Sequence, residues 1–192
     1  MNIHSAMRMG FGCSVVWAAL ALASPATAQT SFRPERSTMT GDIVYRSATM
    51  LVRSKDGITG TIHTSGLTPG FVYTAWFAIF NNPENCFTRP CTPNDIMNNP
   101  AVQGSLLGFG GQLADLDGTA DFGETRAVGD ATNAFFGPGL LNPKRAEIHL
   151  AVRSHGPASM DPAVFAEQLT TFNGNCPPNT CMTIQAAVHA PK

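Results

Sequence analysis

The apolar positions of the chain fall in short runs that are separated by clusters of Gly, Pro and Asn. The longest run, at 71–80 (FVYTAWFAIF), is almost continuously apolar and aromatic. A strand that is covered on both faces has this composition, so we expect 71–80 to be the central core strand, with Trp76 buried. At 146–153 apolar and polar residues alternate, which predicts a half-buried strand with Glu147 and His149 on its polar face.

Several other segments have the composition or the alternation of strands. They are 43–52, 58–64, 102–113, 119–124, 168–172 and 183–188. Asp117 and Gly118 form a pair that is common in tight turns, and they predict a hairpin between two of these strands. Gly and Pro interrupt every window of helical length, and only 162–168 has room for a short helix. The pattern predicts an all-β fold, a two-sheet antiparallel sandwich of immunoglobulin-like type with about seven or eight strands.

Two connections, 81–100 and 126–145, are longer than the turns of a β-hairpin. Long loops on a rigid sandwich commonly carry the residues that bind other molecules. We therefore expect a ligand or a protein partner to bind through these two loops.

The N-terminal segment has the three parts of an export signal. Arg8 provides a positive charge, 11–23 is apolar, and the small residues Ala26 and Ala28 precede a cleavage site before Gln29. The apolar run is shorter than the roughly 20 residues that span a membrane, and no later segment is long and apolar enough to do so. We therefore predict a protein that is exported to the periplasm or secreted, without a membrane span.

After the signal peptide at 1–28, we expect a loose polar leader at 29–40 and a single β-sandwich domain at 41–192. Charged residues make up only 13% of the chain. Typical domains contain about 25%, and a disordered, highly charged protein is thereby excluded. The formal net charge is −1 and no run of basic residues occurs, so nucleic acid is not an expected partner.

The cysteines that follow the signal segment form two pairs of equal spacing, Cys86 with Cys91 and Cys176 with Cys181. An even number of cysteines in an exported chain favours disulfides over free thiols. Two local bridges close the shortest loops at the lowest entropic cost, so we predict the bridges Cys86–Cys91 and Cys176–Cys181. A zinc site with four cysteine ligands is the alternative interpretation of this spacing.

Histidines also follow the signal segment, at His63, His149, His155 and His189. Imidazoles from neighbouring strands, together with Glu147, would make a copper or zinc site if the strands bring them together. The alternative is that polar strand faces carry histidine because they contact water, and that Glu147 pairs with a neighbouring charge.

The acidic residues Asp115, Asp117 and Asp121 offer carboxylates to Ca²⁺, but they lack the rest of an EF-hand loop, and a plain turn explains them. The chain has no Gly-x-Ser-x-Gly, no Gly-rich phosphate loop and no His-Glu-x-x-His. Ser154 precedes His155 directly, which is adjacency rather than a catalytic triad. We therefore expect a protein that is not an enzyme and has no cofactor, apart from the copper or zinc considered above.

The segment 67–74 (LTPGFVYT) resembles the Leu-x-Pro-Gly-x-x-Tyr segment of fibronectin type III domains. The resemblance implies that Tyr73 makes a corner hydrogen bond, and it does not extend to the topology. Further segments resemble a set of uncharacterised exported bacterial proteins, a resemblance that implies no activity. They are YTAW at 73–76, FNNPENC at 80–86, GPGL at 137–140, AEIHL at 146–150 and QLTTF at 168–172.

Two hypotheses about function follow from these observations. The first is an exported, non-catalytic β-sandwich protein that binds a partner or has a structural role through its long loops. The alternative is a copper- or zinc-binding periplasmic protein that uses His149 and neighbouring histidines.

Overall fold

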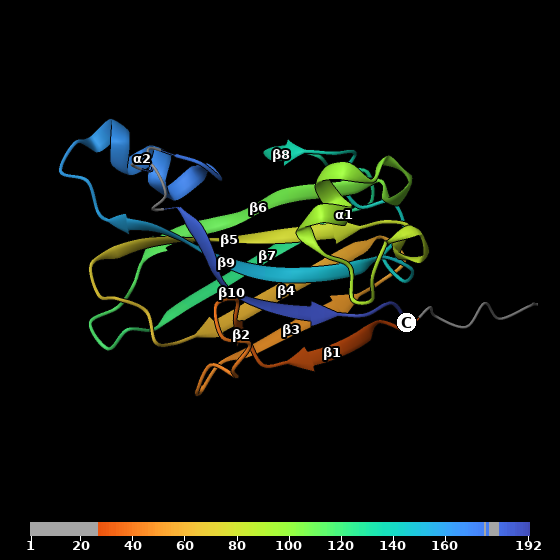
Figure 1. Ribbon diagram of the computed structural model, residues 1–192, viewed down its shortest axis with the longest axis horizontal. Helices are drawn as coiled ribbons and strands as arrows, with labels where there is room; N and C mark the ends of the chain where they lie inside the picture. The colour runs from red at the N-terminus through yellow and green to blue at the C-terminus, as the bar shows by residue number, and fades with distance from the viewer. Residues whose placement is uncertain (1–26, 175, 177–180) are drawn as a thin grey trace, which may run out of the picture.

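A computed structural model of the chain describes residues 27–174, 176 and 181–192. Its strands form two antiparallel sheets, one of four strands and one of six, that pack against each other (Figure 1). The predicted all-β sandwich is therefore confirmed. The described part of the chain contains ten strands, more than predicted, together with two short helices and two 3₁₀ turns.

The smaller sheet contains the first described strand at one edge. Its members, in spatial order, are β1 (Gln29–Arg33), β3 (Ala48–Arg53), β4 (Gly57–Thr64) and β7 (Ala120–Ala127). Ile58 and Ile62 on β4 point into the core and are each 1% exposed. Between them, a Cβ atom on Gly60 would lie 2.8 Å from ring carbons of Phe77 and Phe109, so only glycine fits between the sheets at this point.

The larger sheet contains the longest apolar run of the sequence. Its members, in spatial order, are β2 (Arg36–Ser37), β10 (Met182–His189), β9 (Glu147–Pro157), β5 (Phe71–Phe80), β6 (Gly104–Leu113) and β8 (Ala134–Phe136). β5 pairs with β9 along one edge and with β6 along the other. The prediction of a central strand at 71–80 is confirmed, with the same bounds.

Both faces of the larger sheet are covered, which explains why β5 is apolar on both sides. Its inner face packs against the smaller sheet, and Phe77 and Leu150 there are 0% exposed. Its outer face carries α1 (Pro93–Asn98) and α2 (Pro162–Thr170), which stand at opposite ends of the sheet (Figure 1). Trp76 lies on this outer face and is only 3% exposed, so the prediction that it is buried is confirmed.

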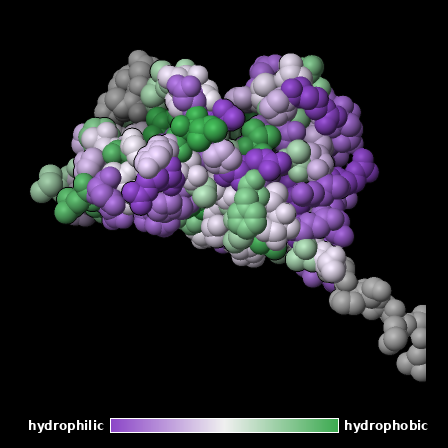
Figure 2. All heavy atoms as spheres, turned by 90° about the horizontal axis from the view of Figure 1, so that it is seen from below, coloured by the Kyte–Doolittle hydropathy of each residue, from purple (hydrophilic) through white to green (hydrophobic). Residues whose placement is uncertain are grey.

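The middle of the outer face is less covered than its ends. The loop at 81–100 folds over one end as η1 (Pro83–Asn85) and α1, followed by η2 (Pro100–Val102). Ala78 on β5 and Ala151 on β9 lie between the helices and are half-buried. In the view from below, the surface is hollowed between two raised parts, and hydrophobic residues gather in the hollow (Figure 2).

The predicted loose leader at 29–40 is wrong. Gln29–Arg33 forms β1 and pairs with β3, and Arg36–Ser37 forms β2 and pairs with β10. Both are edge strands. An edge strand needs backbone partners on one side only and tolerates polar side chains, so its sequence carries little of the usual strand signal.

The predicted strand at 168–172 is also wrong, because its first three residues belong to α2. The side chain of Asp161 accepts hydrogen bonds from the backbone N–H groups of Ala163 and Val164, and Pro162 occupies the first turn. These features start a helix, and the helix then continues through Thr170.

The turn at Asp117 and Gly118 is present, and Gly118 has a positive φ of 76°, which glycine adopts without strain. However, it connects β6 to β7, and these strands belong to different sheets. The predicted hairpin is therefore a crossover between the sheets.

The predicted signal peptide at 1–28 lies outside the described residues, except for its last two positions. Among the described residues, neither helix has the length and apolar character needed to cross a membrane.

Candidate functional site

The histidines predicted as metal ligands do not come together. His63 is exposed on β4, with Nδ1 2.8 Å from Oδ1 of Asp121. His149 and His155 share the outer face of β9 but are six residues apart, about 20 Å along a strand. His189 is buried between the sheets. Because these positions lie on different faces or far apart, the predicted copper or zinc site centred on His149 is not formed in the described part of the chain.

Glu147 and His149 instead attach the loop at 81–100 to the sheet. Oε1 of Glu147 lies 2.8 Å from Nε2 of His149 and accepts a hydrogen bond of 2.7 Å from the backbone N–H of Cys91. Burial opposes the ionisation of Glu147, but these hydrogen bonds outweigh it and hold the pKa of the carboxyl below its usual value. This pair therefore has a structural role.

His189 connects the two sheets. Its Nδ1 lies 2.8 Å from Oγ of Ser31 on β1, and its Nε2 lies 2.9 Å from Oγ1 of Thr49 on β3. Burial lowers the pKa of His189 to about 4, so the imidazole is neutral near pH 7. Both ring nitrogens are occupied by hydroxyl groups, and neither is free to bind a metal.

The carboxylates considered for calcium are engaged separately. Oδ1 of Asp117 accepts a hydrogen bond of 2.7 Å from the hydroxyl of Thr119, and Asp121 pairs with His63. No group of three carboxylates forms within the described residues. The turn explains this acidic segment, as the sequence indicated.

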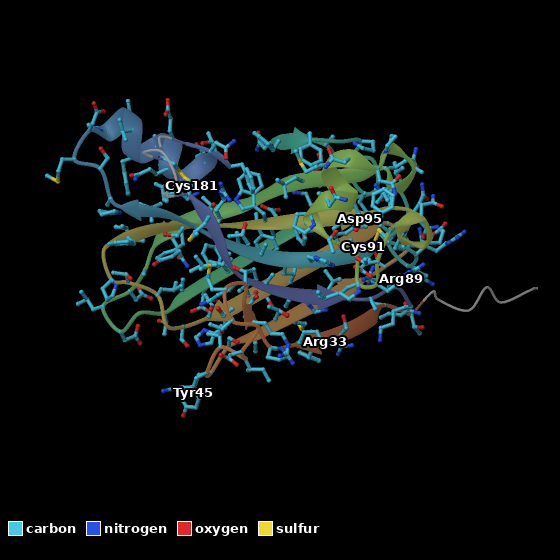
Figure 3. The ribbon with its side chains drawn as sticks, in the orientation of Figure 1. Arg33, Tyr45, Arg89, Cys91, Asp95 and Cys181 are labelled. Atoms are coloured by element: carbon cyan, nitrogen blue, oxygen red, sulfur yellow. A yellow bond between two sulfur atoms is a disulfide. The ribbon has the colours of Figure 1, made fainter. Side chains whose placement is uncertain are left out.

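The cysteines lie in the two predicted local pairs. The Cα atoms of Cys86 and Cys91 are 5.5 Å apart and those of Cys176 and Cys181 are 5.4 Å apart, within the usual range for disulfides. The pairs are at opposite ends of the outer face, with Cys181 beside α2 and Cys91 beside α1 (Figure 3). This separation rules out the alternative four-cysteine zinc site.

His155 lies against the second cysteine pair. Its Nδ1 is 3.3 Å from Sγ of Cys181 and 3.6 Å from Sγ of Cys176. These three residues are the one group of three potential metal ligands found in the described part of the chain, with all ligand atoms within 4.8 Å of one another. Burial lowers the pKa of His155, whose side chain is 1% exposed. We call these residues the His155 cluster.

The other ring nitrogen of His155 is held by the central strand. Nε2 lies 2.8 Å from Oγ1 of Thr74, and the same oxygen accepts a hydrogen bond of 2.7 Å from the indole N–H of Trp76. Ser154 does not contribute, because its hydroxyl accepts a hydrogen bond of 3.3 Å from the backbone N–H of Gly156. The orientation of the imidazole is thus determined by two buried residues of β5.

A cleft of about 460 Å³ lies on the other side of Thr74 and Trp76. Its floor is β5 and β6, and its walls are the loop at 126–145 and the end of α2. The lining residues are Thr74–Trp76, Gly108–Gly110, Glu124, Arg126, Asn133–Phe135 and Leu169–Phe172. One of the two loops predicted to bind a partner therefore contributes to this cleft, whereas the loop at 81–100 does not.

Three aromatic rings lie next to one another along the lining of the cleft. The ring of Phe172 meets Trp76 edge to face at 5.1 Å between centroids, and the ring centroid of Phe135 also lies 5.1 Å from that of Phe172. Trp76 is buried, Phe172 is half-buried and Phe135 is 48% exposed. The rings thus form a surface that extends from the sheet to the solvent.

Arg153 and the packing of α2 on β6 hold this aromatic surface in position. The guanidinium of Arg153 lies 4.0 Å from the ring centroid of Phe172, and its Nε donates a hydrogen bond of 2.7 Å to the backbone oxygen of the same residue. The end of α2 also packs directly on β6, where a Cβ atom on Gly111 would lie 2.2 Å from the backbone oxygen of Leu169. Only glycine at 111 allows this approach.

One edge of the cleft is polar. Arg126 donates a hydrogen bond of 2.5 Å to the backbone oxygen of Gly108, and its Nη1 lies 3.4 Å from Oδ2 of Asp130. Glu124 and Asn133 flank it. Since Arg126 already has protein partners, this edge can orient a ligand without presenting an unpaired charge.

Comparisons with protein families, curated proteins and solved structures find no match for this chain. The resemblances to exported bacterial proteins and to fibronectin type III domains therefore stay predictions. The hydroxyl of Tyr73 does accept a hydrogen bond of 3.0 Å from the backbone N–H of Thr68, the kind of contact that the second resemblance implies.

The sequence did not indicate that Phe135, Phe172 and Arg126 belong to one site. Phe135 lies in a segment expected to be a loop, and Phe172 in one expected to be a strand. Each is an ordinary apolar or charged residue in isolation, and only the packing of α2, β7 and β8 against β6 brings them together.

Proposed function

We propose that this protein is an exported, non-catalytic binding protein whose ligand is a small molecule with a flat aromatic ring. The observation that carries the proposal is the row of aromatic rings in the cleft, whose outermost ring, Phe135, is 48% exposed and packs against Phe172, while Trp76 at its inner end is buried. A flat ring can stack against exposed aromatic side chains, each contact contributing about 0.5–1.5 kcal/mol beyond simple burial.

The size and lining of the cleft support this ligand class. Its volume of about 460 Å³ lies in the range of small-molecule sites. Apolar walls with a few polar groups at one edge are typical of such sites, and Glu124, Arg126 and Asn133 provide that edge. Binding rather than catalysis is proposed because Arg126, the cation at this edge, is engaged with Gly108 and Asp130.

Export is supported by the position of the first described strand. β1 begins at Gln29, the residue that directly follows the predicted cleavage site. The paired cysteines are also typical of chains that fold in an oxidising compartment. We expect N-terminal sequencing of the protein from the periplasm or medium to start at or near Gln29, whereas a chain starting at Met1 would contradict export by this signal.

Binding in the cleft is tested with the fluorescent probe 1-anilinonaphthalene-8-sulfonate, which carries a flat ring system. We expect Phe135→Ala to weaken binding of the probe about three- to tenfold, because one ring of the aromatic surface is lost. The matched control is Phe87→Ala, since Phe87 is 66% exposed in the other long loop. Equal affinities for the wild type and Phe135→Ala, or an equal loss in the control, would place the ligand elsewhere.

A further inference from the structure

The His155 cluster combines two sulfur atoms and one imidazole at one end of the larger sheet. Thiolate sulfur and imidazole nitrogen are the ligands that soft metal ions prefer in proteins. We propose that, after reduction of the Cys176–Cys181 bridge, the two thiolates and Nδ1 of His155 bind one Cu(I) ion. This inference does not rest on the proposed ligand of the cleft.

The distances from Nδ1 of His155 to the two sulfur atoms fit a single ion. Donors held at about 2.0–2.3 Å from one metal lie roughly 3.5–4 Å from one another. Nδ1 of His155 is 3.3 Å from one sulfur and 3.6 Å from the other. Once the sulfur–sulfur bond is broken, the two sulfur atoms must move apart to a similar distance from each other to complete the site.

The buried residues around His155 orient its ring for this role. Metal-bound histidines usually use their second ring nitrogen in a hydrogen bond that fixes the ring. Here Nε2 faces Oγ1 of Thr74, which can accept a hydrogen bond from it. Nδ1 lies 3.4 Å from the backbone oxygen of Gly174, and its lone pair is available to a metal in the tautomer that carries the proton on Nε2. The indole N–H of Trp76 holds the same Thr74 oxygen in place. Thr74 and Trp76 are therefore positioning residues.

The number of ligands favours Cu(I) over zinc. Structural zinc sites almost always have four protein ligands. In the described part of the chain, the cluster contains three residues able to bind a metal, and two of them supply sulfur. A three-coordinate site rich in sulfur suits a soft monovalent ion.

The chemical step is a reduction followed by metal binding. A dithiol reductant transfers two electrons and two protons to the sulfur–sulfur bond of Cys176 and Cys181, and itself becomes a disulfide. The two new thiol groups then lose their protons as Cu(I) binds to the thiolates. Copper enters as Cu(I), so the copper itself is neither oxidised nor reduced.

The chain contains a matched control for this site. Cys86 and Cys91 have the same spacing and nearly the same Cα separation, 5.5 Å compared with 5.4 Å. Among the described residues, however, they are not part of a group of three metal ligands. A reduced cysteine pair without an imidazole is thus available in the same molecule.

The test is an anaerobic titration of the reduced mature protein with Cu(I), in competition with the chelator bathocuproine disulfonate. We expect one tightly bound copper per chain in the wild type and in Cys86→Ser/Cys91→Ser, and none in Cys176→Ser/Cys181→Ser. His155→Asn should bind copper at least tenfold more weakly. X-ray absorption of the wild-type complex should show two sulfur ligands and one nitrogen ligand.

Each alternative outcome overturns the proposal. If the reduced wild type does not compete for Cu(I), the proposed site does not exist. If only Cys86→Ser/Cys91→Ser loses copper, the metal binds at the other cysteine pair. If the site binds Zn²⁺ more tightly than Cu(I) and uses a fourth ligand, it is a zinc site. Because the cysteine variants test the site independently, a folding defect in His155→Asn does not affect the conclusion. Binding of the fluorescent probe to the cleft does not depend on any of these results.

Discussion

Replacing Trp76 by alanine is expected to lower the free energy of unfolding by about 3–5 kcal/mol. Trp76 on β5 is only 3% exposed, and its ring packs against that of Phe172 on the outer face of the larger sheet. Its removal leaves a cavity that a paired strand and the end of α2 cannot easily close, and Thr74 loses its hydrogen bond from the indole. Such a loss is a large share of the roughly 5–15 kcal/mol that stabilises a domain.

The measurement is chemical denaturation of the mature protein, followed by circular dichroism. Phe87→Ala is the control, and because Phe87 is 66% exposed we expect a change within about 0.5 kcal/mol. His149→Ala should also lower the free energy of unfolding less than Trp76→Ala does. His149 is partly exposed, and without it Glu147 still accepts its hydrogen bond from the backbone N–H of Cys91. An unchanged midpoint for Trp76→Ala would show that this side chain is not enclosed.

Replacing Arg53 by methionine is expected to destabilise the protein by a similar amount, about 3–5 kcal/mol. Arg53 on β3 is 0% exposed, and its guanidinium joins the smaller sheet to the start of β9 and the C-terminal segment. The backbone oxygens that accept its hydrogen bonds belong to Pro143, Ala146, His189 and Ala190. Methionine fills much of the same volume but cannot donate hydrogen bonds to these buried carbonyl groups.

Arg53 keeps its charge despite its burial. Burial lowers the pKa of Arg53 to about 10, partly offset by the carboxylate of Glu147, so the side chain is protonated near neutral pH. The control is Arg36→Met, because Arg36 is exposed and donates to a single backbone oxygen, that of Gly41. Equal stability of the two variants would contradict a central role for Arg53 in joining the sheets.

The sequence by itself determined the all-β class and the central elements of the sandwich. The bounds of β5 matched the apolar run at 71–80, and Ile148, Leu150 and Val152 on β9 are all 0% exposed, as the alternation predicted. Strands that are buried on one or both faces carry this information locally, because each position must be apolar where it contacts the core. The pairing of the cysteines was also local, since each pair closes a short loop.

The tertiary structure alone decided which polar residues have partners. Glu147 was expected on a solvated strand face, but the loop at 81–100 covers it, and it is 3% exposed. His155 faces the pair Cys176 and Cys181, a contact that depends on how the chain after α2 returns to the sheet. Contacts of this kind leave no period in the sequence, because their partners come from distant segments.

The edges of the sheets and the cleft were decided in the same way. β1, β2 and β8 are edge strands, whose polar or short sequences have little intrinsic preference for a strand and become strands only by pairing with a neighbour. The aromatic surface joins Phe135, Phe172 and Trp76 from three separate segments of the chain. The sequence determined the buried strands, because a buried strand must be apolar. The tertiary structure decided the contacts between side chains from distant segments, because the local pattern does not constrain them.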